Sequence, residues 1–224
     1  MRQFVLFLLL VLACQIQAVA ADRTVEPLNE APSGLSDEVK AVLQESGYRI
    51  SDKTGVICDI WLVKDLPLKP KFKPSLRVKY PILSGQLVGA IRYPEGGNPT
   101  DFRGQPLKPG IFTLRYGLQP DDGNHLGTSD IRDFLVGCPP DKDTRPARVE
   151  DLKKLFKLSS GAAGTTHPSI YLLIPPPEKA GEGAAVSFDG EKNLTVFEAV
   201  LIGKEGETSL PIPTRIVVQG KTEA

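Results

Sequence analysis

The chain contains two histidines, His125 and His167, and both fall in predicted loops beside the ends of strands. Loops that join strands carry a large share of the binding and catalytic residues of proteins. Because imidazole is the commonest metal ligand, this pair suggests a metal site if the two loops meet. A carboxylate from Asp121, Asp122 or Asp130 would complete a transition-metal site that keeps open positions. A metal-dependent enzyme or a metal-binding protein is therefore one interpretation of this chain.

The residues around the histidines also fit a site that holds no metal. Asp122-Gly123-Asn124 is typical of a turn, in which His125 would only pack or hydrogen-bond locally. Turns beside strand ends still present polar side chains to a ligand. We therefore take Asp122, Asn124, His125 and His167 as candidates for ligand binding, and we identify no catalytic residue.

Familiar catalytic motifs are missing from the sequence. It contains no G-x-S-x-G nucleophile turn, no H-E-x-x-H pair and no phosphate-binding loop. Arg103, Arg132 and Asp133 are expected to be solvated or paired with other charges. The chain has 27 basic and 27 acidic residues, so its formal net charge is zero. Because a nucleic-acid surface needs a clustered excess of basic residues, the composition argues against a nucleic-acid partner.

The single tryptophan, Trp61, is a candidate for stacking against a ligand. Side chains alternate between the two faces of a strand, and Trp61 falls on the face opposite the expected core. The residues expected to point into the core are Val56, Cys58, Ile60 and Leu62. Trp61 is therefore the aromatic residue that we expect to be exposed, next to a glycan or another ligand. The alternative is that it packs under a helix or a loop.

Two cysteines, Cys58 and Cys138, fall on predicted core faces of strands. An exported compartment permits a disulfide between them. The bond would require the two strands to be neighbours in register, with α-carbons within about 7 Å. The alternative is a pair of buried free thiols that pack as small apolar residues.

The N-terminal residues have the layout of a secretory signal peptide. Arg2 precedes an apolar run from Phe4 to Ala13, and the small residues Ala18-Val19-Ala20 follow it. This pattern predicts a signal peptide over residues 1–20 and a periplasmic or extracellular protein. The run is shorter than the roughly 20 residues that span a bilayer. Alternatively, Val11-Leu12-Ala13-Cys14 resembles a bacterial lipobox, so that Cys14 would carry a lipid anchor.

Short apolar segments separated by glycine and proline predict a mainly β fold. Residues 21–34 are polar and are expected to form a flexible leader, and residues 35–220 to form a single β-rich domain. One helix is predicted after the N-cap Ser36, ending at Gly47, and another from Pro146, closed by Gly161 and Gly164. The expected strands are Tyr48–Ser51, Val56–Val63, Gln86–Tyr93, Ile111–Leu118, Ile131–Cys138, Ser169–Ile174, Ala184–Phe188, Leu194–Ile202 and Pro213–Gln219. The pattern indicates a β-sandwich or open β-barrel-like domain with two short helices.

Three segments carry a resemblance to known proteins. They are Gly104-Gln105-Pro106-Leu107-Lys108-Pro109-Gly110-Ile111-Phe112-Thr113-Leu114-Arg115-Tyr116, Asp121-Asp122-Gly123-Asn124-His125-Leu126-Gly127 and Arg132-Asp133-Phe134-Leu135. The first resembles the turn and strand of many secreted bacterial β-sandwich domains. Together, over roughly residues 84–174, they are similar to an uncharacterised family of exported bacterial proteins. The resemblance implies the fold and export, and it implies no activity.

These features favour an exported module that binds a ligand or a partner, either a protein or a glycan, at the loops near His125 and His167. Two alternatives stay open. One is a metal-dependent enzyme or metal-binding protein that uses both histidines. The other is a structural domain of the cell envelope that has no small-molecule site.

Overall fold

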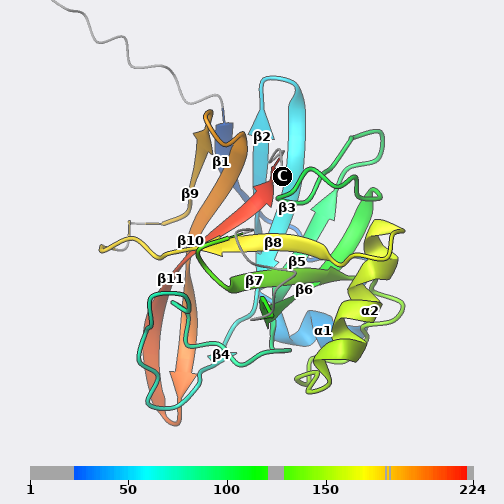
Figure 1. Cartoon of the computed structure of the whole chain (residues 1–224). Coiled ribbons are helices and arrows are strands. Elements are labelled where there is room, and N and C mark those ends of the chain that lie inside the picture. The colour runs from blue at the N-terminus through cyan, green and yellow to red at the C-terminus, as the bar shows by residue number, and fades with distance from the viewer. Residues whose placement is uncertain (1–22, 121–128, 180, 182, 221–224) are drawn as a thin grey trace, which may run out of the picture.

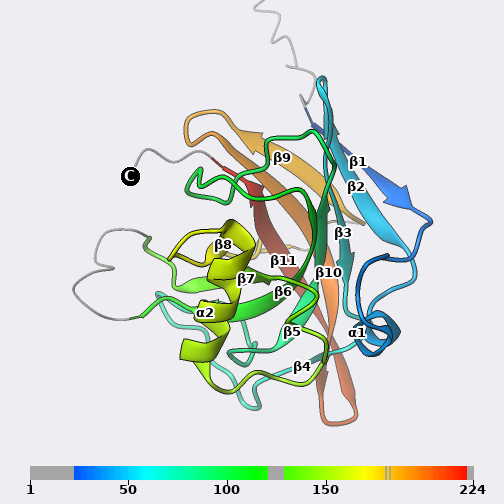
Figure 2. The same ribbon diagram turned by 90° about the vertical axis from the view of Figure 1, so that its right-hand side faces the viewer.

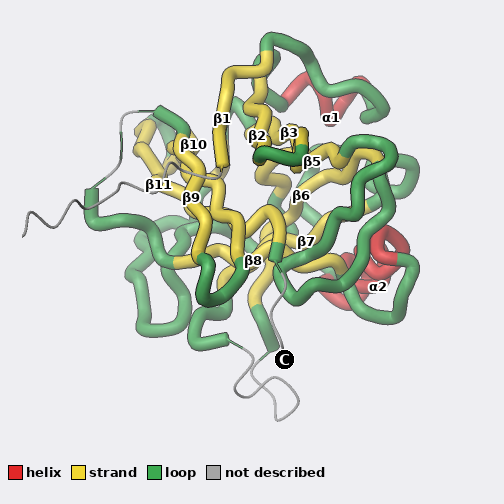
Figure 3. Tube along the Cα trace, turned by 90° about the horizontal axis from the view of Figure 1, so that it is seen from above, coloured by secondary structure: helices red, strands yellow, loops and turns green. Residues whose placement is uncertain are grey.

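The computed structural model describes residues 23–120, 129–179, 181 and 183–220, and it is mainly β (Figure 1). Its antiparallel sheet is nearly closed into a barrel, which confirms the predicted fold class. Seen from above, the strands curve around a common interior, and both helices lie outside them (Figure 3). No helix among these residues is long and apolar enough to cross a membrane.

The described elements follow the predicted order, with one strand added before the first helix and a short one after β3. The strands are β1 (Arg23–Leu28), β2 (Gly47–Asp52), β3 (Gly55–Leu62), β4 (Leu66–Pro67), β5 (Leu87–Tyr93), β6 (Gly110–Leu118), β7 (Asp133–Cys138), β8 (Ser169–Ile174), β9 (Ala185–Asp189), β10 (Leu194–Glu205) and β11 (Thr208–Gln219). The helices are α1 (Asp37–Val42) and α2 (Leu152–Ala163).

The sheet runs in the order β1-β2-β3-β5-β6-β7-β8-β11-β10-β4, and β9 also pairs with β10. Strand β1, at one end of this order, approaches β10 and β9 at Arg23. The Arg23 Nε donates a hydrogen bond to Thr195 Oγ1 of β10, and its guanidinium lies 4.4 Å from the ring centroid of Phe188 in β9. Side-chain contacts therefore join β1 to β9 and β10.

Strand β1 corrects the prediction of a flexible leader over residues 21–34. All six of its residues pair antiparallel with β2, and Val25 and Leu28 pack against the core. The strand was not recognised from the sequence because of its polar residues. An edge strand needs only a few apolar side chains. The predicted signal peptide, its cleavage site and Cys14 lie outside the described residues.

Both helices begin at a side chain that caps the backbone. Ser36 accepts a hydrogen bond from the backbone N–H of Val39, as predicted for α1. Helix α2 begins after Asp151, whose side chain accepts from the N–H of Lys154, and not at Pro146. It ends at Gly164, which has the left-handed backbone that favours glycine. Figure 2 shows α2 in front of β7 and β8.

The two cysteines are free and buried, so the candidate disulfide is not formed and the alternative of two free thiols holds. Cys58 lies on β3 and Cys138 on β7, and two strands, β5 and β6, separate them. Ile60 of β3 is in register with Phe112 through Ile91, whereas Cys138 is opposite Thr113. Phe112 and Thr113 point to opposite faces, and Cys58, two residues before Ile60, shares the face of Phe112. The two thiols therefore lie on opposite sides of the sheet. Cys138 packs under α2 on the outer face, which corrects the predicted core face of its strand.

Burial also makes the two thiols poor nucleophiles. It raises the pKa of both Cys58 and Cys138 above the usual range. Since the thiolate is the reactive form, both cysteines act here as small apolar residues, which was the alternative interpretation.

The outer face of β3 carries a buried carboxylate, Asp59, between two arginines. Arg49 Nε and Arg92 Nη2 each lie 2.7 Å from its oxygens. Burial by itself would raise the pKa of Asp59. The hydrogen bonds from Arg49 and Arg92 outweigh this effect, so the pKa of the carboxyl lies below its usual value.

Replacement of Asp59 by asparagine is expected to lower the free energy of unfolding by about 1 kcal/mol at neutral pH, since the arginines are partly exposed. A lowered folded-state pKa contributes stability above the unfolded pKa, which is about 3.9, and this contribution disappears as the pH falls through the folded-state pKa. The difference in unfolding free energy between the wild type and Asp59→Asn should therefore have its full value at pH 5–7 and should decrease below pH 4. Urea unfolding across this range measures it, with Asp141→Asn as an exposed control. An equal gap at pH 3 and pH 7 would contradict the assignment.

Candidate functional site

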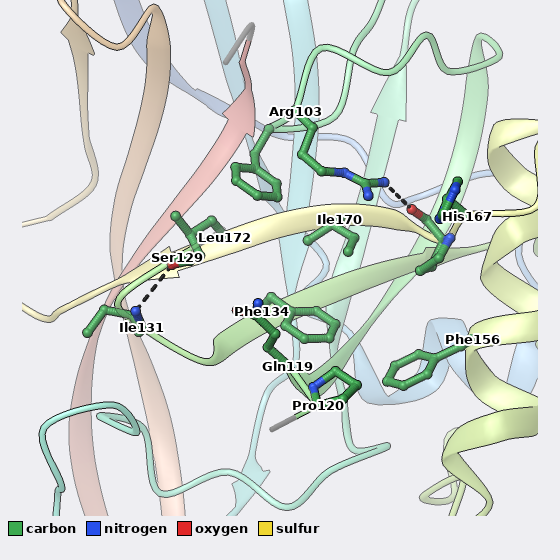
Figure 4. A pocket seen from close by; sticks show the side chains of 12 residues that line it. Arg103, Gln119, Pro120, Ser129, Ile131, Phe134, Phe156, His167, Ile170 and Leu172 are labelled. Atoms are coloured by element: carbon green, nitrogen blue, oxygen red, sulfur yellow. Dashed lines mark hydrogen bonds between the residues drawn. The ribbon is translucent and has the colours of Figure 1, made fainter. Parts of the chain in front are cut away.

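A pocket of about 210 Å³ lies on the outer face of β7 and β8, between α2 and the loop that contains Phe102 (Figure 4). Its lining is mostly apolar. Three phenylalanines, Phe102, Phe134 and Phe156, come from three different segments. The other apolar lining residues are Pro120, Ile131, Pro168, Ile170 and Leu172. The polar ones are Arg103, Gln119, Ser129 and His167.

The floor of the pocket follows from the register of β7 and β8. Phe134 lies opposite Leu172, and Val136 lies opposite Ile170. Side chains that are directly opposite share a face, so Phe134, Leu172 and Ile170 all point outward. Helix α2 adds one wall, because the ring of Phe156 lies 6.0 Å from that of Phe134, centroid to centroid.

The opposite wall is a loop that binds to the edge of β8. Strand β11 pairs with the end of β8, at Leu173 and Ile174. Nearer the start of β8, the backbone N–H of Phe102 donates to the carbonyl of Ile170. The N–H of Ile170 in turn donates to Asp101 Oδ2. These two bonds continue the sheet with a loop and hold Phe102 and its neighbours beside the pocket.

Arg103 is held at the rim by two partners. Its Nη2 lies 3.1 Å from Asp101 Oδ2 and 3.0 Å from the carbonyl oxygen of Pro168. Figure 4 shows the guanidinium above Ile170, with the bond to Pro168 drawn. The expectation that Arg103 is paired is confirmed. Among the lining residues that the structure describes, it is the one that carries a full charge.

Asp101 is fully buried behind this rim, and its oxygens are used within the loop. Oδ1 accepts from the backbone N–H groups of Arg103 and Gln105. Oδ2 accepts from Arg103 and from the N–H of Ile170. The carboxylate therefore organises the loop and does not line the pocket.

His167 is the predicted site residue that the structure places at this pocket. It is exposed at the rim, and its backbone N–H donates to Thr165 Oγ1. The other candidates at the second loop, His125, Asp122, Asn124 and the metal candidate Asp121, lie outside the described residues. The contact between the loops of His125 and His167 therefore stays a prediction.

The metal site that combines His125 and His167 therefore also stays a prediction. Within the part of the chain that the structure describes, no three His, Cys, Asp or Glu side chains are grouped so that they could hold a metal ion.

The expected exposure of Trp61 is wrong, because its side chain is completely buried. Its Nε1 donates to the carbonyl of Glu30 at 2.7 Å, and the guanidinium of Arg92 lies 5.0 Å from its ring centroid. Arg92 and the segment that follows β1 thus cover Trp61 on the outer face of β3. This is the alternative interpretation, in which Trp61 packs under a loop. Val56, expected in the core, is instead exposed near the hairpin turn.

A buried arginine, Arg115, fixes the connection that leads into α2. Its Nε lies 2.6 Å from Asp143 Oδ2, and its Nη1 lies 2.9 Å from the carbonyl oxygens of Gly85 and Ala147. It also donates to the carbonyl of Arg145. These bonds hold residues 143–147 in a non-helical conformation beside β6, which explains why the helix begins later than predicted. The same bonds set the position of the pocket wall formed by α2.

The three phenylalanines of the pocket were missed as site residues. Alternation along β7 and helical periodicity along α2 put Phe134 and Phe156 on apolar faces, for which packing in the core is the simplest interpretation. The sequence does not show that α2 and the Phe102 loop leave a gap between them.

Comparison of the chain with protein-family models, with curated proteins and with solved structures finds no match. The resemblance to a family of exported bacterial proteins therefore stays a prediction.

Proposed function

We propose that this chain is an exported binding module that holds a small, mainly apolar ligand in the pocket between α2 and the Phe102 loop. The observation that carries the proposal is the apolar lining on the outer face of β7 and β8, formed around Phe102, Phe134 and Phe156. Export rests on the signal-peptide pattern of residues 1–20.

The size of the pocket supports a ligand of about ten non-hydrogen atoms. An apolar cavity of about 150 Å³ is large enough to hold benzene, and this pocket, at about 210 Å³, is larger. Pockets with mainly apolar walls and a few polar groups at the rim are typical of small-molecule sites.

The polar groups at the pocket support binding rather than catalysis. Ser129 Oγ accepts a hydrogen bond from the N–H of Ile131, so the hydroxyl takes part in its own turn. His167 lies at the exposed rim, and its neighbour Pro168 is bonded to Arg103. This arrangement supports a role of these groups in orienting a ligand.

The test is a titration with 1-octanol, a neutral probe of suitable size. Binding is monitored through the amide chemical shifts of the isotope-labelled protein. We expect saturable binding with a Kd of about 0.1–1 mM, since such a ligand gains roughly 0.5 kcal/mol per non-hydrogen atom. The shifts should centre on Phe134, Phe156 and Ile170. Ile170→Trp, which fills the pocket, should weaken binding at least tenfold.

The matched control is Ile202→Trp on β10, because Ile202 is also a partly exposed strand residue and does not line the pocket. It should bind the probe as the wild type does. Unsaturable shifts, or equal binding by both tryptophan variants, would refute the proposal.

A further inference from the structure

We propose that the ligand of this pocket is an amphipathic acid, with its apolar body on the outer face of β7 and β8 and its carboxylate hydrogen-bonded to Arg103. This inference rests on the proposed binding function and names the chemical class of the ligand. It starts from the single full charge on the described lining, which sits at the edge of an otherwise apolar wall.

The guanidinium of Arg103 has a donor left for a ligand. Nε and Nη2 are directed to Asp101 and Pro168. Among the described residues, no hydrogen bond uses Nη1. The side chain is 29% exposed, so a ligand at the rim can reach it. A hydrogen bond between a guanidinium and a carboxylate oxygen is charge-assisted and roughly twice as strong as one between neutral groups.

The negative partner of Arg103 does not compete with a ligand. Asp101 is fully buried, and both of its oxygens already accept hydrogen bonds from the loop and from β8. The charge that faces the pocket is therefore that of the arginine. A ligand ammonium would meet this positive charge and would find no carboxylate on the described lining.

The arginine is also positioned before any ligand arrives. Two fixed acceptors, Asp101 Oδ2 and the Pro168 carbonyl, hold the guanidinium over Ile170 (Figure 4). Because the side chain is already ordered, binding costs little additional conformational entropy. The polar end of the pocket is thus built as a rigid donor, and the three phenylalanines form the apolar part.

The experiment compares three probes with the same chain, octanoate, 1-octanol and octylamine, on the wild-type protein at neutral pH and low salt. Octanoate should bind about tenfold more tightly than octanol, since one charge-assisted hydrogen bond at a partly exposed site has roughly this effect. Octylamine should bind most weakly. Arg103→Gln should remove the advantage of octanoate over octanol, so that the two probes bind this variant with similar affinity.

Arg49→Gln is the matched control. Arg49 also pairs with a buried carboxylate, Asp59, which keeps Arg92 as a second partner. Arg49 does not line the pocket, so Arg49→Gln should keep the full preference for octanoate over octanol. If Arg103→Gln fails to fold, the Nε–H resonance of Arg103 in the wild type provides the second readout. It should shift with octanoate and stay unchanged with octanol.

The outcomes separate the two proposals. If octanol and octanoate bind equally to the wild type, the inference is wrong and the binding function stands. An octanoate preference that survives in Arg103→Gln also overturns the inference, because the carboxylate would then lie elsewhere. If none of the three probes binds, the proposed function itself fails.

Discussion

Asp143→Ala is expected to destabilise the protein by about 3–5 kcal/mol, because it leaves the charge of Arg115 buried without a counter-charge. Arg115 is fully buried, and Asp143 is nearly so. Thr113 also donates to the same carboxylate and would lose its acceptor. Urea unfolding followed by circular dichroism measures the loss. Since these bonds hold the segment before α2, the variant should also bind 1-octanol more weakly at concentrations of urea where it is still folded.

Asp141→Ala is the control for this prediction, since Asp141 is two residues away, is exposed, and pairs with Lys142 on the surface. Its replacement should change the unfolding free energy by no more than about 0.5 kcal/mol. In addition, Arg115→Met combined with Asp143→Leu should be less destabilised than Asp143→Ala, because no unpaired charge remains. Similar losses for Asp143→Ala and Asp141→Ala would show that the buried pair does not anchor this segment.

Trp61→Ala is expected to cost about 3–5 kcal/mol, the usual range for removing a large buried aromatic side chain. Trp61→Phe keeps most of the ring volume but leaves the Glu30 carbonyl without its donor, so it should cost about 1–2 kcal/mol. Urea unfolding followed by circular dichroism compares the variants. Because Trp61 is the single tryptophan, the wild-type protein also reports on it directly. Its emission should be blue-shifted and protected from acrylamide in the folded state.

Phe188→Ala is the control for an aromatic side chain at the surface. Phe188 is 38% exposed on β9 and lies against Arg23. Its replacement should cost about 1 kcal/mol, because less apolar area is lost and the cation–π contact is partly exposed. A wild-type emission spectrum that matches that of the unfolded chain would restore the interpretation of Trp61 as an exposed ligand-binding residue.

Alternation of side chains was sufficient to predict the central strands and one of their faces. In β6, alternation puts Phe112, Leu114 and Tyr116 on one apolar face, and all three are buried. The same alternation puts Thr113 and Arg115 on the opposite face, where the structure also has them. Their burial was not predictable, because it depends on residues 139–151, which lie far away in the sequence.

The candidate site shows the same limit. His167 could be selected because histidine in a loop beside a strand is easily recognised, and Arg103 could be expected to have a charged partner. Their common position at one rim depends on a bond between Arg103 and the Pro168 carbonyl, across 65 residues of sequence. Phe102 reaches the pocket because its loop fills a free stretch of the β8 edge, and no local pattern predicts that contact.

The sequence by itself determined the mainly β class, the order of most strands, the caps at Ser36 and Gly164 and most of the inward-facing residues of β3 and β6. These depend on local backbone preference and on a period of two residues, both of which can be read along one segment. Only the tertiary structure decided that Trp61 and Arg115 are covered, that Cys58 and Cys138 lie on opposite sides of the sheet, and that three phenylalanines surround a pocket. Each of these depends on which distant segment packs against a given face, since burial results from contacts between segments and not from the segment alone.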